Sequence, residues 1–179
     1  MNILIVDDVA VNLKLLRAQL EAEDHAVFEA QDGVEALEVL EEKPVDLVIS
    51  DILMPRMDGY HLCTEIRNSK KFASLPFIVY TATYTSPADE KLSLELGADR
   101  YLRKPAAAAE IKQTIKAVTS EQRQRTPQSI RSANDIAVMK EYNAVLVSKL
   151  EEKLVELEAI NQKATRIGRS IGAGLRRHY

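Results

Sequence analysis

Hydrophobic and polar positions follow two alternating patterns over the first 120 residues of this chain. Short, nearly continuous apolar runs, typical of strands covered on both faces, are each followed by a segment whose apolar residues recur every three or four positions. The strands are expected at residues 3–6, 25–30, 45–50, 75–81 and 100–102. Because a segment of helical period follows each strand, the pattern predicts successive βα units and a parallel sheet.

Turn and capping residues separate the same elements. The residues at the expected ends of the second, third and fourth helices are of the types that start or stop helices: Asp32-Gly33, Asp58, Ser86-Pro87 and Gly97. Right-handed crossovers between parallel strands place each helix on one face of the sheet. We therefore expect an α/β fold over residues 1–120, a doubly wound five-stranded parallel sheet in the flavodoxin-like order 2-1-3-4-5.

The composition fits a soluble protein with a packed core. The chain has 179 residues, 46% of them hydrophobic and 28% charged, which is close to the globular average and excludes disorder throughout. Cys63 is the only cysteine, so no internal disulfide can form. The start of the chain lacks the features of a signal peptide, and no segment approaches the roughly 20 apolar residues of a membrane span. A cytoplasmic protein without a membrane span is expected.

A different pattern begins after residue 120. Residues 121–134 are polar and lack a hydrophobic period, which predicts a linker, whereas residues 135–165 contain neither glycine nor proline. The clearest apolar positions of the second segment are spaced three and four apart: Val147, Leu150, Leu154 and Leu157. This heptad spacing predicts a coiled-coil helix, in which Lys153 and Glu158 would face each other across a parallel pair. A parallel homodimer through residues 135–165 is favoured; the alternative is that this helix folds back onto residues 1–120.

Charge is distributed unequally along the chain. Residues 1–120 hold 13 basic and 20 acidic side chains, whereas residues 121–179 hold 11 basic and 7 acidic ones. Residues 166–179 contain three glycines and no acid, which predicts a basic tail that is disordered or truncated. Such a tail could meet an anionic partner, although a solvated linker explains the same composition. No recognisable nucleic-acid-binding domain follows residue 120.

Acidic residues stand where two of the expected strands end. Asp7 and Asp8 follow the first strand, and Asp51 follows the third. If these strands are neighbours in a parallel sheet, three carboxylates meet at its carboxyl edge, where open α/β sheets place their sites. Such a cluster repels itself unless a cation neutralises it, and oxygen ligands alone favour Mg2+. This arrangement favours phosphate chemistry on or beside a carboxylate.

Further residues at the strand ends complete a recognisable set. In chain order the set comprises Asp7-Asp8, Asp51 at the start of DILMPRMDG, Thr81-Ala82, Tyr101 and Lys104-Pro105. In this set, residues 1–120 resemble the receiver domain of bacterial two-component response regulators. The resemblance implies that Asp51 is a phosphoacceptor, which takes a phosphoryl group from a histidine kinase or a phosphotransfer protein.

The resemblance also assigns roles to the surrounding residues. It implies that Asp8 and Asp51 bind Mg2+ directly, Asp7 through water, and Leu53 through its backbone carbonyl. Lys104 would add a compact positive charge beside the phosphoryl group, and Thr81 would offer its hydroxyl to a phosphoryl oxygen. Tyr101 would then change from exposed to buried as the switch residue. Taken singly, each of these side chains also fits an ordinary loop or capping role.

Other functions fit the residues less well. An aspartyl-nucleophile phosphatase of the haloacid dehalogenase type places a second acid two residues after its nucleophile, where this chain has Leu53. A nucleotide or flavin binder would need a glycine-rich loop after the first strand, and none is present. Asn12 and Gly59 are interpreted as structural. The receiver could belong to a stand-alone regulator, or be a fragment of a larger hybrid kinase or cyclase regulator.

Overall fold

The structure is a computed structural model that describes residues 1–122 and Val147. Within residues 1–122, strands and helices alternate strictly along the chain. In order they are β1 (Asn2–Val6), α1 (Ala10–Glu21), β2 (Ala26–Ala30), α2 (Gly33–Glu42), β3 (Leu47–Ser50), α3 (Gly59–Asn68), β4 (Phe77–Thr81), α4 (Pro87–Glu95), β5 (Arg100–Arg103) and α5 (Ala108–Gln122). Each expected element is present, which confirms the alternation predicted from the hydrophobic pattern.

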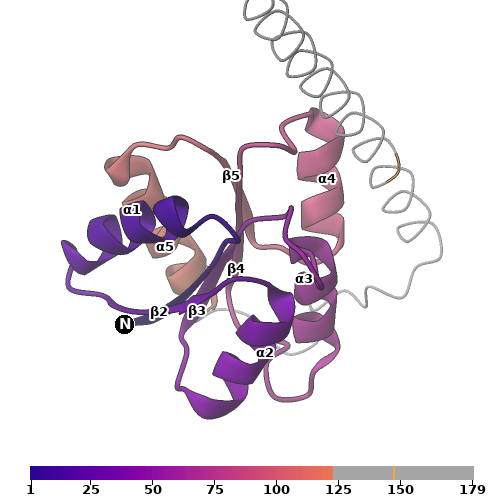
Figure 1. Cartoon of the computed structure of the whole chain (residues 1–179), viewed down its shortest axis with the longest axis horizontal. Coiled ribbons are helices and arrows are strands. Elements are labelled where there is room, and N and C mark those ends of the chain that lie inside the picture. Colours follow the sequence, from indigo (N-terminus) through magenta and orange to yellow (C-terminus); the bar gives the residue numbers. More distant parts are fainter. Residues whose placement is uncertain (123–146, 148–179) are drawn as a thin grey trace, which may run out of the picture. The chain divides into compact units, whose positions relative to one another are not determined.

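The strands form one parallel sheet in the order β2-β1-β3-β4-β5. Helices α1 and α5 cover one face of this sheet, and α2, α3 and α4 cover the other (Figure 1). The doubly wound order 2-1-3-4-5 expected from the sequence is therefore confirmed. Because all strands run the same way, the carboxyl ends of β1, β3, β4 and β5 share one edge of the sheet.

The apolar residues that set the periods form the core. On one face of the sheet, α1 and α5 pack against the central strands through residues three or four positions apart: Leu13, Leu16, Leu20, Ile111, Ile115 and Val118. Strands β1, β3 and β4 are buried along almost their whole length, as expected for strands covered on both faces. The core therefore holds the strand ends in fixed register.

Helix capping follows the sequence expectations. Asp58 accepts a hydrogen bond from the backbone N–H of His61 at the start of α3. Ser86 and Asp89 form a reciprocal capping box at the start of α4. Gly97 adopts a φ of +106° after α4, a left-handed conformation that glycine reaches without steric cost.

Two strands begin two residues later than expected. β3 begins at Leu47, because Val45 and Asp46 lie before the buried part of the sheet. β4 begins at Phe77, because Pro76 has no N–H to donate to a neighbouring strand. Both differences lie at the edge opposite the acidic residues, so they leave the expected site unchanged.

Helix α5 extends to Gln122 and includes the first two residues of the expected linker. The rest of the linker, the expected coiled coil and the basic tail lie outside the described residues, apart from Val147. Among the described residues, no helix is long and apolar enough to cross a membrane.

Candidate functional site

The charged residues of the site lie at the carboxyl ends of three strands. Asp7, Asp51 and Lys104 directly follow β1, β3 and β5. Backbone hydrogen bonds continue past the strand ends: the N–H of Asp51 donates to the carbonyl of Val6 at 2.8 Å, and that of Lys104 to Thr81 at 2.8 Å. The sheet itself therefore determines where these three side chains start.

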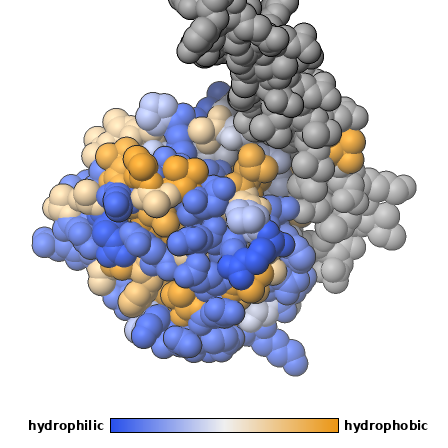
Figure 2. Space-filling model, viewed as in Figure 1, coloured by the Kyte–Doolittle hydropathy of each residue, from blue (hydrophilic) through white to orange (hydrophobic). Residues whose placement is uncertain are grey.

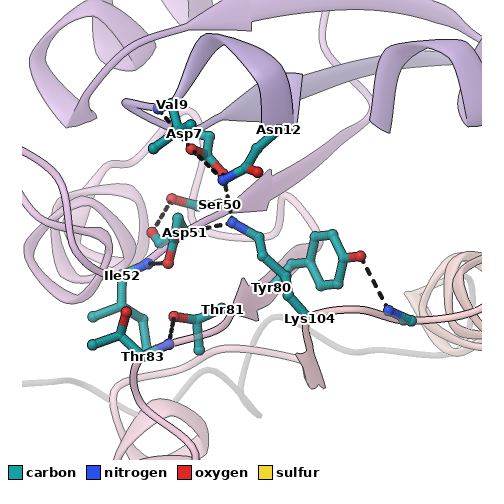
Figure 3. Close-up of polar contacts among 11 residues, drawn as sticks. Asp7, Val9, Asn12, Ser50, Asp51, Ile52, Tyr80, Thr81, Thr83 and Lys104 are labelled. Atoms are coloured by element: carbon teal, nitrogen blue, oxygen red, sulfur yellow. Dashed lines mark hydrogen bonds and ion pairs between the residues drawn. The ribbon is translucent and has the colours of Figure 1, made fainter. Parts of the chain in front are cut away.

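Lys104 lies between the carboxylates of Asp7, which is buried, and Asp51, which is partly buried (Figure 3). Its Nζ is 2.5 Å from Oδ2 of Asp7 and 2.6 Å from Oδ2 of Asp51. The three side chains are only 13%, 7% and 12% exposed, respectively, so water screens their interaction weakly. Burial opposes the charge on Lys104, but Asp51 and Asp7 outweigh it and raise the pKa of Lys104. The lysine is thus firmly held as a cation.

Asp7 is oriented by a residue that the sequence suggested was only structural. The Nδ2 group of Asn12 donates to both carboxylate oxygens of Asp7 at 3.1 Å, and the N–H of Val9 donates to Oδ1 at 2.8 Å. Asn12 lies in the first turn of α1, from which its side chain points back toward the end of β1 (Figure 3). The interpretation of Asn12 was therefore incomplete. The position of Asn12, five residues after Asp7 and in the first helical turn after the acidic pair, could have indicated this contact from the sequence.

Asp51 is held by its own loop. Its Oδ1 accepts from the N–H of Ile52 at 2.6 Å, and its backbone carbonyl accepts from the hydroxyl of Ser50 at 2.7 Å. A Cβ atom on Gly59 would lie 2.1 Å from the carbonyl oxygen of Asp51. Gly59 therefore permits a close backbone approach that no other residue could make, and its structural interpretation gains a specific cause.

Asp8 carries the third carboxylate and is exposed. Partial burial and the like charges of Asp7 and Asp51 raise its pKa above the ordinary 3.8. Among residues 1–122, Lys104 is the cation that contacts Asp7 and Asp51, so the three carboxylates leave the site with an excess of negative charge. Among the described residues, no three acidic, histidine or cysteine side chains converge closely enough to bind a metal ion as they stand. The excess charge and the oxygen donors nevertheless suit a hard divalent cation.

Thr81 and Tyr101 lie on the neighbouring strands β4 and β5. Thr81 is fully buried, and its Oγ1 accepts from the N–H of Thr83 at 3.4 Å. Tyr101 is half-buried, but its hydroxyl oxygen is buried and lacks a hydrogen-bond partner among the described residues. Burial, together with the charge of Asp89, raises the pKa of Tyr101 to about 12.

The remaining candidates occupy other places. Leu53 is exposed in the loop that follows Asp51. Cys63 is buried on α3, and burial raises the pKa of its thiol to about 12, in agreement with an inert core role. His61 pairs with Glu65 on the exposed side of the same helix. None of these three side chains is part of the Asp7, Asp51 and Lys104 contact.

A family model described as the response regulator receiver domain matches residues 3–116. The chain belongs to this family. The match covers all five strands and most of α5, so the set of residues at the strand ends lies within it. The receiver resemblance drawn from the sequence is confirmed.

The matching segment is only part of two longer relatives with different names. The chain is 37% identical over 117 residues to the alkaline phosphatase synthesis transcriptional regulatory protein PhoP of Bacillus subtilis, which is 65% of this chain and 48% of PhoP. It is 42% identical over 115 residues to the sensor histidine kinase RcsC of Escherichia coli, which is 64% of this chain and 12% of RcsC. The chain thus spans about half, or less, of these relatives.

A solved receiver structure shares the fold and contains a metal. The receiver domain of the sensor histidine kinase PA1611 from Pseudomonas aeruginosa superposes with a TM-score of 0.61 and 29% identity, over 66% of this chain and 97% of that one. That structure has a magnesium ion coordinated in its active site cleft.

Proposed function

We propose that this receiver accepts a phosphoryl group on Asp51 from the phosphohistidine of a partner histidine kinase or phosphotransfer protein. The observation that carries the proposal is the contact of Lys104 with Asp51 at 2.6 Å at the carboxyl edge of the sheet. Lys104 places a positive charge beside the acceptor, where the transferred phosphoryl group brings further negative charge. The chain thereby acts as a phosphoacceptor signalling domain and not as an enzyme with an external product.

The transfer needs little covalent help from the protein. A carboxylate oxygen of Asp51 attacks the phosphorus, an O–P bond forms, and the N–P bond of the phosphohistidine breaks. The electron pair of that bond stays on the imidazole nitrogen, which takes up a proton. The attacking group is a carboxylate and not a hydroxyl, so no general base is required. The protein mainly positions the groups and offsets negative charge, as is usual in phosphoryl transfer.

The carboxylates of the site fit Mg2+, because this hard cation prefers oxygen ligands. Asp8 and Asp51 would bind it directly, Asp7 through water, and Leu53 through its carbonyl. When bound, Mg2+ neutralises charge on the phosphoryl oxygens. Asn12 contributes by holding both oxygens of Asp7 in place, since groups that orient ligands support affinity.

The partner kinase would approach over α1. Val11 and Leu15 are exposed on this helix, and a groove of about 240 Å³ opens between α1 and the loop that contains Lys104 and Pro105. Figure 2 shows apolar surface gathered over α1 within a mostly hydrophilic face. A phosphohistidine must reach Asp51 from the surface beside it, so apolar side chains at that place favour docking of the donor.

Phosphorylation is proposed to shift Thr81 and Tyr101. The Thr81 hydroxyl would bind a phosphoryl oxygen, and Tyr101 would move inward into the space vacated. The buried hydroxyl of Tyr101 supports this switch, because an unpaired buried hydroxyl costs roughly 1–3 kcal/mol and leaves the resting position suboptimal. The driving energy would come from hydrogen bonds to about two added negative charges.

Tyr101→Phe is expected to raise the free energy of unfolding by about 1 kcal/mol, because it removes the unpaired hydroxyl while retaining the ring. Urea denaturation measures the change. Tyr80→Phe is the matched control on the adjacent strand: its hydroxyl accepts from the N–H of Ala106 at 3.3 Å, so its loss should lower stability by about 1 kcal/mol. A loss of stability in Tyr101→Phe equal to that in the control would contradict the assignment.

The output is proposed to pass through residues 135–165 as a parallel coiled-coil homodimer, with 121–134 as a linker and 166–179 as a basic tail. The heptad spacing of Val147, Leu150, Leu154 and Leu157 supports this. PhoP and RcsC have different functions by name, so the receiver alone does not define the output. A cytoplasmic location suits a kinase partner.

Sedimentation equilibrium with and without a beryllofluoride phosphate mimic tests the dimer. We expect a mass of twice the chain mass of 20.0 kDa at micromolar concentration, and a monomer after Leu150→Lys and Leu154→Lys, because charge at core positions disfavours association. A monomer in both states at high concentration would exclude the coiled-coil dimer and favour the helix that folds back.

A further inference from the structure

The loop after Asp51, residues 52–58, is attached to the start of α2 by an ion pair. Arg56 donates from Nε to Oδ2 of Asp32 at 2.5 Å, and a second guanidinium nitrogen contacts the same oxygen. Asp32 follows β2 and Arg56 follows β3, so the contact joins two loops 24 residues apart. Asp32 lies outside the set that carries the receiver resemblance, and Arg56 lies within DILMPRMDG but has no role assigned by it.

The two oxygens of Asp32 have separate tasks. Oδ1 caps α2 by accepting from the N–H groups of Val34 and Glu35 at 2.9 and 3.1 Å. Oδ2 accepts from Arg56. Asp32 is only 2% exposed, and a buried carboxylate needs such partners. An ordinary helix cap would need only the first oxygen, so the second is available to hold the loop.

The backbone of Arg56 also requires outside support. Its φ is +58°, a left-handed conformation that glycine, asparagine and aspartate adopt far more readily than arginine. The next residue makes a second attachment to α2: the carbonyl of Met57 accepts from the N–H of Gly33 at 3.0 Å. The side chain of Met57 also fills the space beside Gly33. The loop is therefore held to α2 at its left-handed residue and at the residue that follows it.

The same loop returns to the acceptor. The N–H of Gly59 donates to the carbonyl of Ile52 at 2.9 Å, and Gly59 lies against the backbone of Asp51. A displacement at Arg56 would therefore be passed to residues 51–53. These residues contain the proposed acceptor and the proposed carbonyl ligand of Leu53.

We propose that Arg56 is a positioning residue, whose ion pair with Asp32 holds the acceptor loop in the geometry required for phosphorylation of Asp51. The inference rests on the proposed function. Arg56 touches neither the phosphoryl donor nor the reacting atoms, and its side chain is 58% exposed. The guanidinium end of the pair is open to water, and Asp32 keeps its two backbone donors when Arg56 is changed, so the effect should be local to the loop and not a general loss of folding.

The test compares Arg56→Asn with wild type in the full chain. Asparagine tolerates the left-handed backbone and is uncharged, so the variant removes the ion pair without adding steric strain. Amide hydrogen exchange of Gly33, measured without Mg2+, should become about tenfold faster, since its N–H is bonded to the loop at Met57. The rate of labelling by acetyl phosphate at subsaturating Mg2+ should fall about tenfold, as for other groups that orient metal ligands.

Three further variants separate positioning from general effects. Arg56→Lys keeps the charge and should recover most of the labelling rate. Asp32→Asn keeps an N-cap acceptor but loses the charge, and combining it with Arg56→Asn should add nothing further. Lys71→Gln is the matched control, because Lys71 also reaches α2 through an ion pair with Glu41 and its side chain is equally 58% exposed. Lys71→Gln should change neither readout.

Each outcome decides the proposal. Unchanged Gly33 exchange and labelling in Arg56→Asn would overturn it, and so would equal losses in Lys71→Gln. Faster Gly33 exchange with an unchanged labelling rate would overturn the positioning role, although it would still show that Arg56 attaches the loop to α2. If the wild-type chain takes no label at all, the proposed acceptor function fails, and the positioning role for phosphorylation fails with it. The exchange rate of Gly33 then shows separately whether Arg56 holds the loop.

Discussion

Asp51→Asn is expected to reduce phosphoryl labelling of this chain to background. The amide is a poor nucleophile and carries no charge, so it cannot form the acyl phosphate by which a carboxylate accepts the group. Asparagine has nearly the same shape and can still accept the N–H of Ile52, so the loop should keep its conformation. Incubation with acetyl phosphate and Mg2+, followed by intact mass measurement, gives the labelled fraction.

The control for this variant is Asp46→Asn. Asp46 lies just before the opposite end of β3 and accepts from the N–H of Asn2 at 2.7 Å, far from the carboxyl edge of the sheet. It should take label at the wild-type rate. Labelling of Asp51→Asn at full strength would refute Asp51 as the acceptor and would point to another carboxylate. A peptide map of the wild-type chain should accordingly place the added mass on the segment that contains Asp51.

Lys104→Met is expected to slow the labelling about 100-fold, the usual loss when a charge that stabilises a transition state is removed. Methionine preserves much of the apolar stem and removes the ammonium group. Asp51 remains present as the nucleophile, so the reaction should still proceed at high donor concentration. A labelling rate within twofold of wild type would exclude a direct role for Lys104 in the transfer.

The same variant should lower the free energy of unfolding by about 3 kcal/mol, because buried Asp7 and partly buried Asp51 lose their common cation. Since the folded-state pKa of Lys104 is raised above 10.5, this contribution is fully present below pH 10.5 and disappears as the pH rises through the folded pKa. The double variant with Asp51→Asn should regain part of the loss, because one of the two repelling charges is gone.

Lys112→Met provides the matched stability control. Lys112 pairs with Glu23, but both side chains are about 40% exposed and water screens the pair, so its loss should cost far less stability than the loss of Lys104. Chemical denaturation of both variants at pH 7 measures the difference. Equal destabilisation in the two variants would show that burial of the Lys104 contacts gives no added stability.

Much of the fold could be predicted from local sequence. Strand and helix periods, the capping residues Asp58 and Ser86, and the strand order all agree with the structure, because each depends on hydrophobic pattern or on neighbouring residues. The meeting of Asp7 and Asp51 followed from the same pattern, since parallel neighbouring strands bring their carboxyl ends to one edge.

Other features were decided only by the tertiary structure. These are the contact of Lys104 with Asp7, 97 residues away, and the ion pair between Arg56 and Asp32. Each depends on how separate loops lie beside one another and on which rotamers the packed surroundings allow. No sequence period encodes such contacts, whereas the alternating strands and helices, and the strand ends at which the charged residues stand, follow from the chain alone.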